Sequence, residues 1–142
     1  MINRSNIDKA LKKLFNRTNS SEFPILVRKA SFTSQPKHKA WIVWDYISQY
    51  TQIDTEGVSD VENGDLTYAV YSAKPEDRAT AVDKVNSVVY PDDTIINDII
   101  EGIHISQILP INNDEITSLQ MGHSTVDVPG ILFSTSIRFH NG

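Results

Sequence analysis

The stretch from Pro129 to His140 alternates between two kinds of side chain, and this alternation limits what the chain can fold into. One set of alternate residues is mostly apolar, and the other is mostly polar. Successive side chains of a strand point to opposite faces of a sheet, so the pattern indicates a strand with one buried face. The chain is therefore expected to build a sheet. The predicted buried set is Ile131, Phe133, Thr135, Ile137 and Phe139.

Further strands are predicted at residues 25–32, 40–50, 65–72 and 103–110. The segment 40–50 is rich in aromatic and β-branched residues on both faces, which indicates a strand covered on both sides. It is expected to pair antiparallel with residues 65–72 across a long acidic connection, 51–64, that ends in the turn signal Asn63-Gly64. Residues 112–125 are predicted to form a second long polar loop.

Two helices are predicted from the spacing of apolar residues. The first follows Ser5, a good N-cap, and repeats apolar residues from Ile7 to Phe15 on one face. The second begins at Pro75, and its apolar face is predicted to hold Ala79, Val82, Val85 and Val89. Residues 94–101 form either a short helix or a loop. The sum is one domain, residues 1–142, of the α+β class: a mostly antiparallel β-sheet with an N-terminal helix and a second helix packed on one face.

Charge is divided unevenly along the chain. Residues 1–40 hold nine basic and two acidic residues, a net of +7, whereas the remaining 102 residues hold four basic and sixteen acidic residues, a net of -12. Such a division is typical of a nucleic-acid-facing segment, of contacts between unlike faces of identical copies, or of a solvated basic helix. The overall net charge of -5 argues against a dedicated DNA-binding domain.

The residue patterns of common active sites do not occur in this sequence. The absence of Cys excludes disulfides, thiolate zinc sites and cysteine nucleophiles, and the four histidines have no close spacing. The acidic loop does not match an EF-hand, because Gly64 falls fifth and Tyr71 twelfth when counted from Asp60. No phosphate-binding loop, dinucleotide fingerprint or nucleophile elbow is present. We therefore expect no enzymatic activity, no catalytic residues, no cofactor and no metal. No apolar run has membrane-spanning length, so no membrane association is expected.

Four stretches resemble the tail terminator (tail completion, or tail-to-head joining) proteins of long-tailed bacteriophages. They are the amphipathic helix Ile7–Phe15, the strand Trp41–Ile47, the strand-then-helix segment Leu66–Val85 and the closing strand Gly130–Phe139. The resemblance lies in hydrophobicity and element order. The loops 51–64 and 112–125 and the basic stretch 17–40 depart from the compact members. Another small neck, adaptor or tail-completion assembly protein without enzymatic activity is the alternative.

The resemblance implies a structural virion protein that forms a homo-oligomeric ring, commonly a hexamer. Such a ring terminates the tail tube and joins it to the head–neck, so the implied partners are the tail-tube protein and neck or connector proteins. The implied location is the tail–neck junction of the virion, after assembly in the host cytoplasm. DNA would pass through the lumen with sequence-independent contacts. The residues predicted to form subunit contacts are Lys9, Lys12, Lys13, Arg28, Lys29, Trp41, Trp44, Tyr46, Asp54, Glu56, Asp60 and Glu62.

Overall fold

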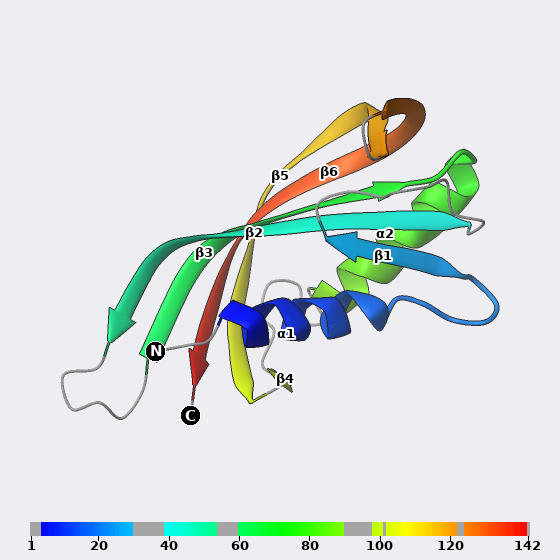
Figure 1. Ribbon diagram of the computed structural model, residues 1–142. Helices are drawn as coiled ribbons and strands as arrows, with labels where there is room; N and C mark the ends of the chain where they lie inside the picture. Colours follow the sequence, from blue (N-terminus) through cyan, green and yellow to red (C-terminus); the bar gives the residue numbers. More distant parts are fainter. Residues whose placement is uncertain are drawn as a thin grey trace.

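The computed structural model describes residues 4–29, 39–53, 60–89, 98–100, 102–121 and 124–141, which form two helices and one six-stranded sheet. Both helices lie on the same side of the curved sheet (Figure 1). The predicted α+β fold, with both helices on one face, is confirmed. The elements are α1 (Arg4–Asn16), β1 (Ile25–Lys29), β2 (Ala40–Ile53), β3 (Asp60–Tyr71), α2 (Pro75–Val89), β4 (Asp98–Ile100), β5 (Ile103–Met121) and β6 (Ser124–Asn141).

The strands follow the order β1-β2-β3-β6-β5-β4, and every described pair except β1–β2 is antiparallel. The predicted pairing of β2 with β3 is confirmed, with Trp44 opposite Tyr68. Tyr68 in turn lies opposite Phe133 of β6, and the two rings stack with centres 5.0 Å apart. Directly paired residues share a face, so these three aromatic residues form a row across the inner, helix-covered face of the sheet.

Helix α1 packs its whole predicted apolar face onto this row. Phe15 places its ring 6.0 Å from Trp44 and 5.4 Å from Tyr68, centre to centre. Burial of side chains of this size stabilises the fold by about 1.5–3 kcal/mol each. The fully buried residues of α1 are Ile7, Ala10, Leu11, Leu14 and Phe15.

Helix α2 begins at Pro75 as predicted, but its predicted buried face is partly wrong. Ala79 is exposed, whereas Ala81 is fully buried together with Val85 and Val89. Residues four apart lie on one side of a helix, and Ala79 lies about 200° around the helix from Ala81. The sheet therefore contacts the Ala81 side, and Val82 packs at its border.

The predicted loop 51–64 is wrong at both ends, because β2 continues to Ile53 and β3 begins at Asp60. The Asn63-Gly64 pair lies inside β3 and does not form a turn. A Cβ at Gly64 would collide with the ring of Tyr46, so glycine is needed here to accommodate a side chain from the neighbouring strand. Residues 54–59 lie outside the described part of the chain.

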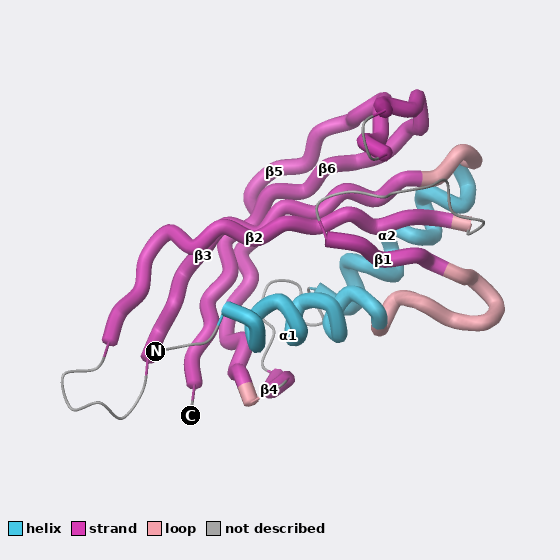
Figure 2. The backbone as a smooth tube through the Cα atoms, viewed as in Figure 1, coloured by secondary structure: helices cyan, strands magenta, loops and turns pink. Residues whose placement is uncertain are grey.

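The predicted loop 112–125 is also wrong, since β5 runs to Met121 and β6 begins at Ser124. Backbone hydrogen bonds hold this hairpin, so its polar sequence does not prevent strand formation. The pairing of β6 with β3 ends at the Tyr71–Gly130 pair. Beyond it, β5 and β6 pair only with each other and form a two-stranded arm (Figure 2). Three register shifts interrupt the β5–β6 pairing, and such bulges allow long strands to bend.

The segment 94–101 does not form the predicted short helix over its described part, because residues Asp98–Ile100 make β4. β4 pairs with Ile103–Ile105 of β5 at the edge of the sheet. Isoleucine favours strands over helices, which is consistent with this outcome. Residues 94–97 and 101 lie outside the described residues.

Candidate functional site

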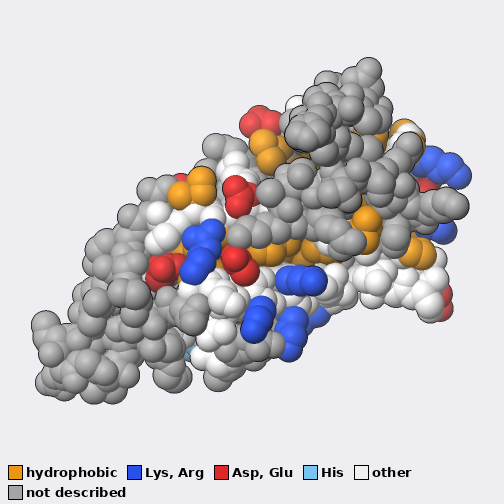
Figure 3. Space-filling view, viewed as in Figure 1, with side chains coloured by type: hydrophobic (Ala, Val, Ile, Leu, Met, Phe, Trp, Pro, Cys, Tyr) orange, Lys and Arg blue, Asp and Glu red, His pale blue; other side chains and the backbone are white. Residues whose placement is uncertain are grey.

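The outward side of α1 is a basic surface. Lys9, Lys12 and Lys13 are all exposed, because the opposite side of the helix is buried against the sheet. Figure 3 shows Lys and Arg side chains gathered over α1. The helix thus places three lysine side chains on one side within little more than one turn, which is suited to contact with an acidic surface.

Arg4, at the beginning of α1, contacts Tyr46 of β2. Arg4 donates a hydrogen bond from Nη2 to the backbone oxygen of Tyr46 at 2.6 Å, and its guanidinium lies 4.8 Å from the centre of the Tyr46 ring. Arg4 Nε also lies 3.4 Å from Asp8 Oδ1. The Tyr46 amide donates to Asp45 Oδ1 at 2.9 Å. Side chains therefore satisfy the β2 backbone at Tyr46, just past Trp44, the last β2 residue that pairs with β1.

The outer face of the sheet, opposite the helices, carries a second apolar cluster. Trp41, Ala69, Tyr71 and Val128 are buried there, each 7% exposed or less. The Nε1 of Trp41 is buried and has no hydrogen-bond partner in the described structure. Three partly buried residues extend the cluster across neighbouring strands: Leu26, Val43 and Leu132.

Carboxylates accompany this cluster on the outer face. Asp45 lies on the same face of β2 as Trp41 and Val43. On the neighbouring strands, Asp65 lies opposite Ile47, and Asp114 lies opposite Leu132. All three aspartates are exposed. Ile47 is also 59% exposed, an unusual value for a large apolar residue in a strand. The outer face thus combines the exposed Ile47 with three exposed aspartates, whereas α1 presents positive charge on the opposite side of the molecule.

Tyr46 and Glu62 form a buried polar pair on the inner face. Tyr46 Oη donates to Glu62 Oε2 at 2.5 Å, and the two residues are 1% and 8% exposed. Burial, together with the hydrogen bond to Glu62 and its negative charge, raises the pKa of Tyr46 well above its ordinary value. The Tyr46 ring also makes an edge contact with Phe139, 5.3 Å between centres. This pair has a structural role, because it joins β2 to β3 inside the core.

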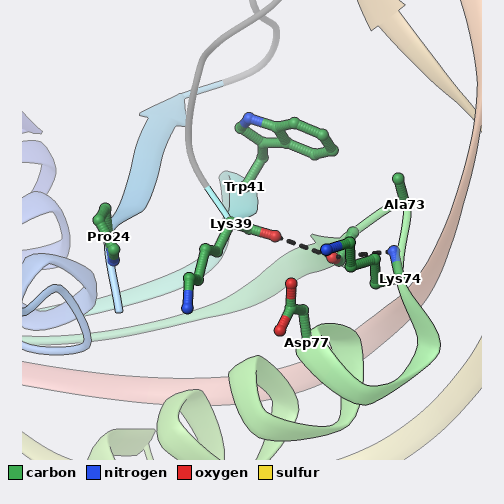
Figure 4. Close-up of a pocket in the computed structure, with 7 residues that line it drawn as sticks. Pro24, Lys39, Trp41, Ala73, Lys74 and Asp77 are labelled. Atoms are coloured by element: carbon green, nitrogen blue, oxygen red, sulfur yellow. Dashed lines mark hydrogen bonds between the residues drawn. The ribbon is translucent and has the colours of Figure 1, made fainter. Parts of the chain in front are cut away.

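An open groove of about 470 Å³ lies where α2 begins (Figure 4). The Ser72 hydroxyl connects two segments that line the groove. Its Oγ donates to the Lys39 backbone oxygen at 2.8 Å and accepts from the Lys74 amide at 3.4 Å. Asp77 is the one acidic side chain among its lining residues. The lining residues are Pro24, Lys39, Trp41, Ser72, Ala73, Lys74 and Asp77.

The structure separates the predicted contact residues into different environments. Lys9, Lys12 and Lys13 share one exposed helix face, as their spacing implied. Trp41 belongs to the outer cluster, but Trp44 and Tyr46 are core residues, 3% and 1% exposed. This corrects their assignment as contact residues, because α1 and the adjacent strands already cover them.

The remaining predicted contact residues are basic or acidic. Glu62 is buried against Tyr46, so its assignment as a contact residue is corrected in the same way. Arg28 and Lys29 lie in β1, opposite Val43 and Trp44. Asp60 is the first residue of β3, while Asp54 and Glu56 lie outside the described residues.

Sequence reasoning missed the acidic outer-face residues Asp45, Asp65 and Asp114 as members of one surface. The alternation of β2 and β3 gave a signal for the first two, because it predicts which residues share a face. Asp114 belongs to the surface only through its register with Leu132, in a segment whose polar composition indicated a loop.

No described helix has the length and hydropathy needed to cross a membrane. Within the described part of the chain, His, Asp and Glu side chains do not form a cluster of three or more that is suited to a metal ion. The chain matches no known family model, and no curated protein is significantly similar to it.

Proposed function

We propose that this protein is a structural, non-enzymatic subunit that forms a ring by contacts between opposite faces of successive copies. The placement of charge carries the proposal: exposed lysines lie on the outward side of α1, and exposed aspartates lie on the outer face of the sheet. A contact between unlike faces is heterologous, and a series of such contacts closes into a ring when the rotation between copies allows it.

The outer face also supplies apolar area for such a contact. Ile47 is exposed, and Leu26, Val43 and Leu132 are only partly buried. Stable interfaces combine an apolar centre with a polar rim, and aromatic side chains such as Trp41 and Tyr71 are enriched in them. Charges at the rim then select the orientation of the incoming copy and increase the rate of association.

In this proposal the ring serves as the tail terminator of a long-tailed bacteriophage, located at the tail–neck junction of the virion. It would end the tail tube on one side and receive neck or connector proteins on the other. The order of helix, strands, Pro-initiated helix and long closing strands supports this assignment, since it resembles that of the terminator family. A neighbouring neck or adaptor protein is the alternative, and binding to tail tubes distinguishes the two roles.

Charge exchange between the two faces tests the ring contact. One variant carries Lys9→Glu and Lys12→Glu, and the other carries Asp65→Lys and Asp114→Lys. Asp45 is left unchanged because its carboxylate accepts a hydrogen bond from the Tyr46 amide. Light scattering and negative-stain electron microscopy should show salt-sensitive rings of the wild type, and neither variant alone should form them.

An equal mixture of the two variants should form rings again, because each reversed face then meets a complementary one. Glu76→Lys with Asp83→Lys, two exposed positions on α2, is the matched control and should leave assembly unchanged. Circular dichroism checks that every variant folds. A wild type that stays monomeric both alone and with added tail tubes would contradict the proposal, as would a mixture that fails to assemble. Rings that do not bind tail tubes would favour the neck or adaptor role.

A further inference from the structure

Two histidines far apart in the sequence lie side by side on the outer face of the sheet. His104 of β5 is directly opposite His140 of β6, and the centres of their rings are 4.5 Å apart with an angle of 60° between the planes. Both side chains are partly exposed. The residues on either side of this pair, Ile103, Ile105 and Phe139, point inward and are buried, which fixes both histidines on the outer face.

The separation of the rings fits coordination of one metal ion by both imidazoles. Metal–nitrogen bonds of about 2.0–2.1 Å place each ring centre about 3.2 Å from the ion. Two rings bound at angles of about 90° to 109° then have centres about 4.5 to 5.2 Å apart. The observed 4.5 Å is compatible with this range. Imidazole ligands suit Zn²⁺, Cu²⁺ and Ni²⁺, and a given nitrogen site binds Cu²⁺ most tightly of the three.

Burial, the neighbouring His104 and the positive charge of Arg138 lower the pKa of His140 below its ordinary value. Neutral imidazole is the form that binds metals, and one ring nitrogen suffices while the other remains available for a hydrogen bond.

Arg138 is a nearby charged group that opposes binding of a cation. Its Nε donates to Asn63 Oδ1 of β3 at 2.9 Å, so this part of the guanidinium is directed toward β3. β3 lies on the opposite side of β6 from β5, which carries His104. On β3 the residue opposite His140 is the apolar Val61, which adds no charge beside the pair.

We propose that His104 and His140 form a two-histidine binding site for a divalent transition metal, with preference for Cu²⁺. The sheet holds the two ligands in place before the metal arrives, so little side-chain ordering is needed on binding. Water or an additional ligand completes the coordination sphere, since the pair supplies two positions. A bound ion would link β5 to β6 next to their pairing with β4 and β3.

Titration of Cu²⁺ and Ni²⁺ into the untagged protein tests the site. Calorimetry and the visible absorption of bound Cu²⁺ should show one equivalent bound per chain at pH 7.5. His104→Asn and His140→Asn should each weaken binding by about tenfold or more, because chelation by two ligands is lost, and tenfold corresponds to about 1.4 kcal/mol. The expected order of affinity is Cu²⁺ above Ni²⁺.

His38→Asn combined with His123→Asn is the matched control, since it removes the same type of ligand elsewhere in the chain. This variant should bind one equivalent with wild-type affinity. The proposal is overturned if His104→Asn and His140→Asn bind as tightly as the wild type, or if the control loses binding to the same extent. Because the two substituted rings are partly exposed, circular dichroism should confirm that the variants remain folded.

Discussion

The two faces of the sheet are made by the same strands but are covered in different ways. Helices α1 and α2 cover the inner face, where Ile42, Leu66 and Val70 are fully buried. The outer face has a small apolar cluster around Trp41, and exposed side chains such as Ile47 and Asp65 lie further along the strands. The described residues therefore complete one hydrophobic layer under the helices and leave the other face only partly covered.

Truncation of one leucine on each face measures this difference directly. Leu66→Ala on the inner face should lower the free energy of unfolding by about 2–5 kcal/mol, because it leaves a cavity in a fully buried site. Leu132→Ala on the outer face should cost only about 1 kcal/mol, since this side chain is partly exposed.

Urea denaturation at a salt concentration that keeps the protein monomeric provides the measurement. Assembly would cover Leu132 and obscure the comparison, so light scattering should confirm the monomer. Equal losses for the two variants would show that the outer face is as well packed as the inner one, which would remove the basis of the comparison.

Two glycines allow a similar comparison, because each makes room for a tyrosine on its own face. A Cβ at Gly64 would collide with Tyr46, which is held by Glu62 and Phe139. A Cβ at Gly130 would lie 2.6 Å from the Tyr71 ring on the outer face and 2.9 Å from the backbone oxygen of Val70. Overpacking costs about 1–3 kcal/mol, and we expect both Gly64→Ala and Gly130→Ala to fall in this range.

Thermal unfolding of the two glycine variants and of two double variants checks the cause. The penalty of Gly64→Ala should fall when Tyr46 is also replaced by Ala, and that of Gly130→Ala should fall when Tyr71 is replaced. Penalties that do not depend on the tyrosines would mean that backbone conformation, and not the ring above each glycine, determines the cost.

The parts of the fold that depend on local patterns could be predicted from the sequence. Apolar spacing located α1, Pro75 located the start of α2, and alternation identified the buried face of β6. The ends of the strands could not be predicted, because pairing with a neighbour satisfies the backbone of a polar segment. For that reason residues 112–121, which are predominantly polar around Asn112 and Asp114, belong to β5.

The candidate surfaces were predictable only where one element forms them. Helical spacing alone places Lys9, Lys12 and Lys13 together. The outer carboxylates and the His104–His140 pair depend on the register between strands that are distant in the sequence, and one residue of slippage would move a side chain to the other face. The burial of Trp44 under α1 likewise depends on which face the helices cover, and the bulky residues on both faces of β2 left that choice open.

Alkaline pH gives the smallest expected effect and compares one tyrosine from each face. Burial raises the pKa of both Tyr46 and Tyr71 above the ordinary value of 10.0, and Glu62 raises that of Tyr46 further. Above pH 10 the unfolded chain releases these protons while the folded chain retains them, so the free energy of unfolding falls as pH rises. Below pH 10 the two groups are protonated in both states and cause no pH dependence.

Urea denaturation at pH values from 8 to 11 should therefore show a shallower alkaline decline for Tyr46→Phe than for the wild type, and Tyr71→Phe should give a smaller change. The lysines titrate in the same range in every variant, so the difference from the wild type isolates each tyrosine. Tyr46→Phe also removes the hydrogen bond to Glu62, which lowers stability at pH 8 without changing the slope below pH 10. An identical alkaline decline in Tyr46→Phe and the wild type would mean that the inner face admits enough water for Tyr46 to ionise. The two faces of the sheet would then differ in packing but not in their exclusion of water.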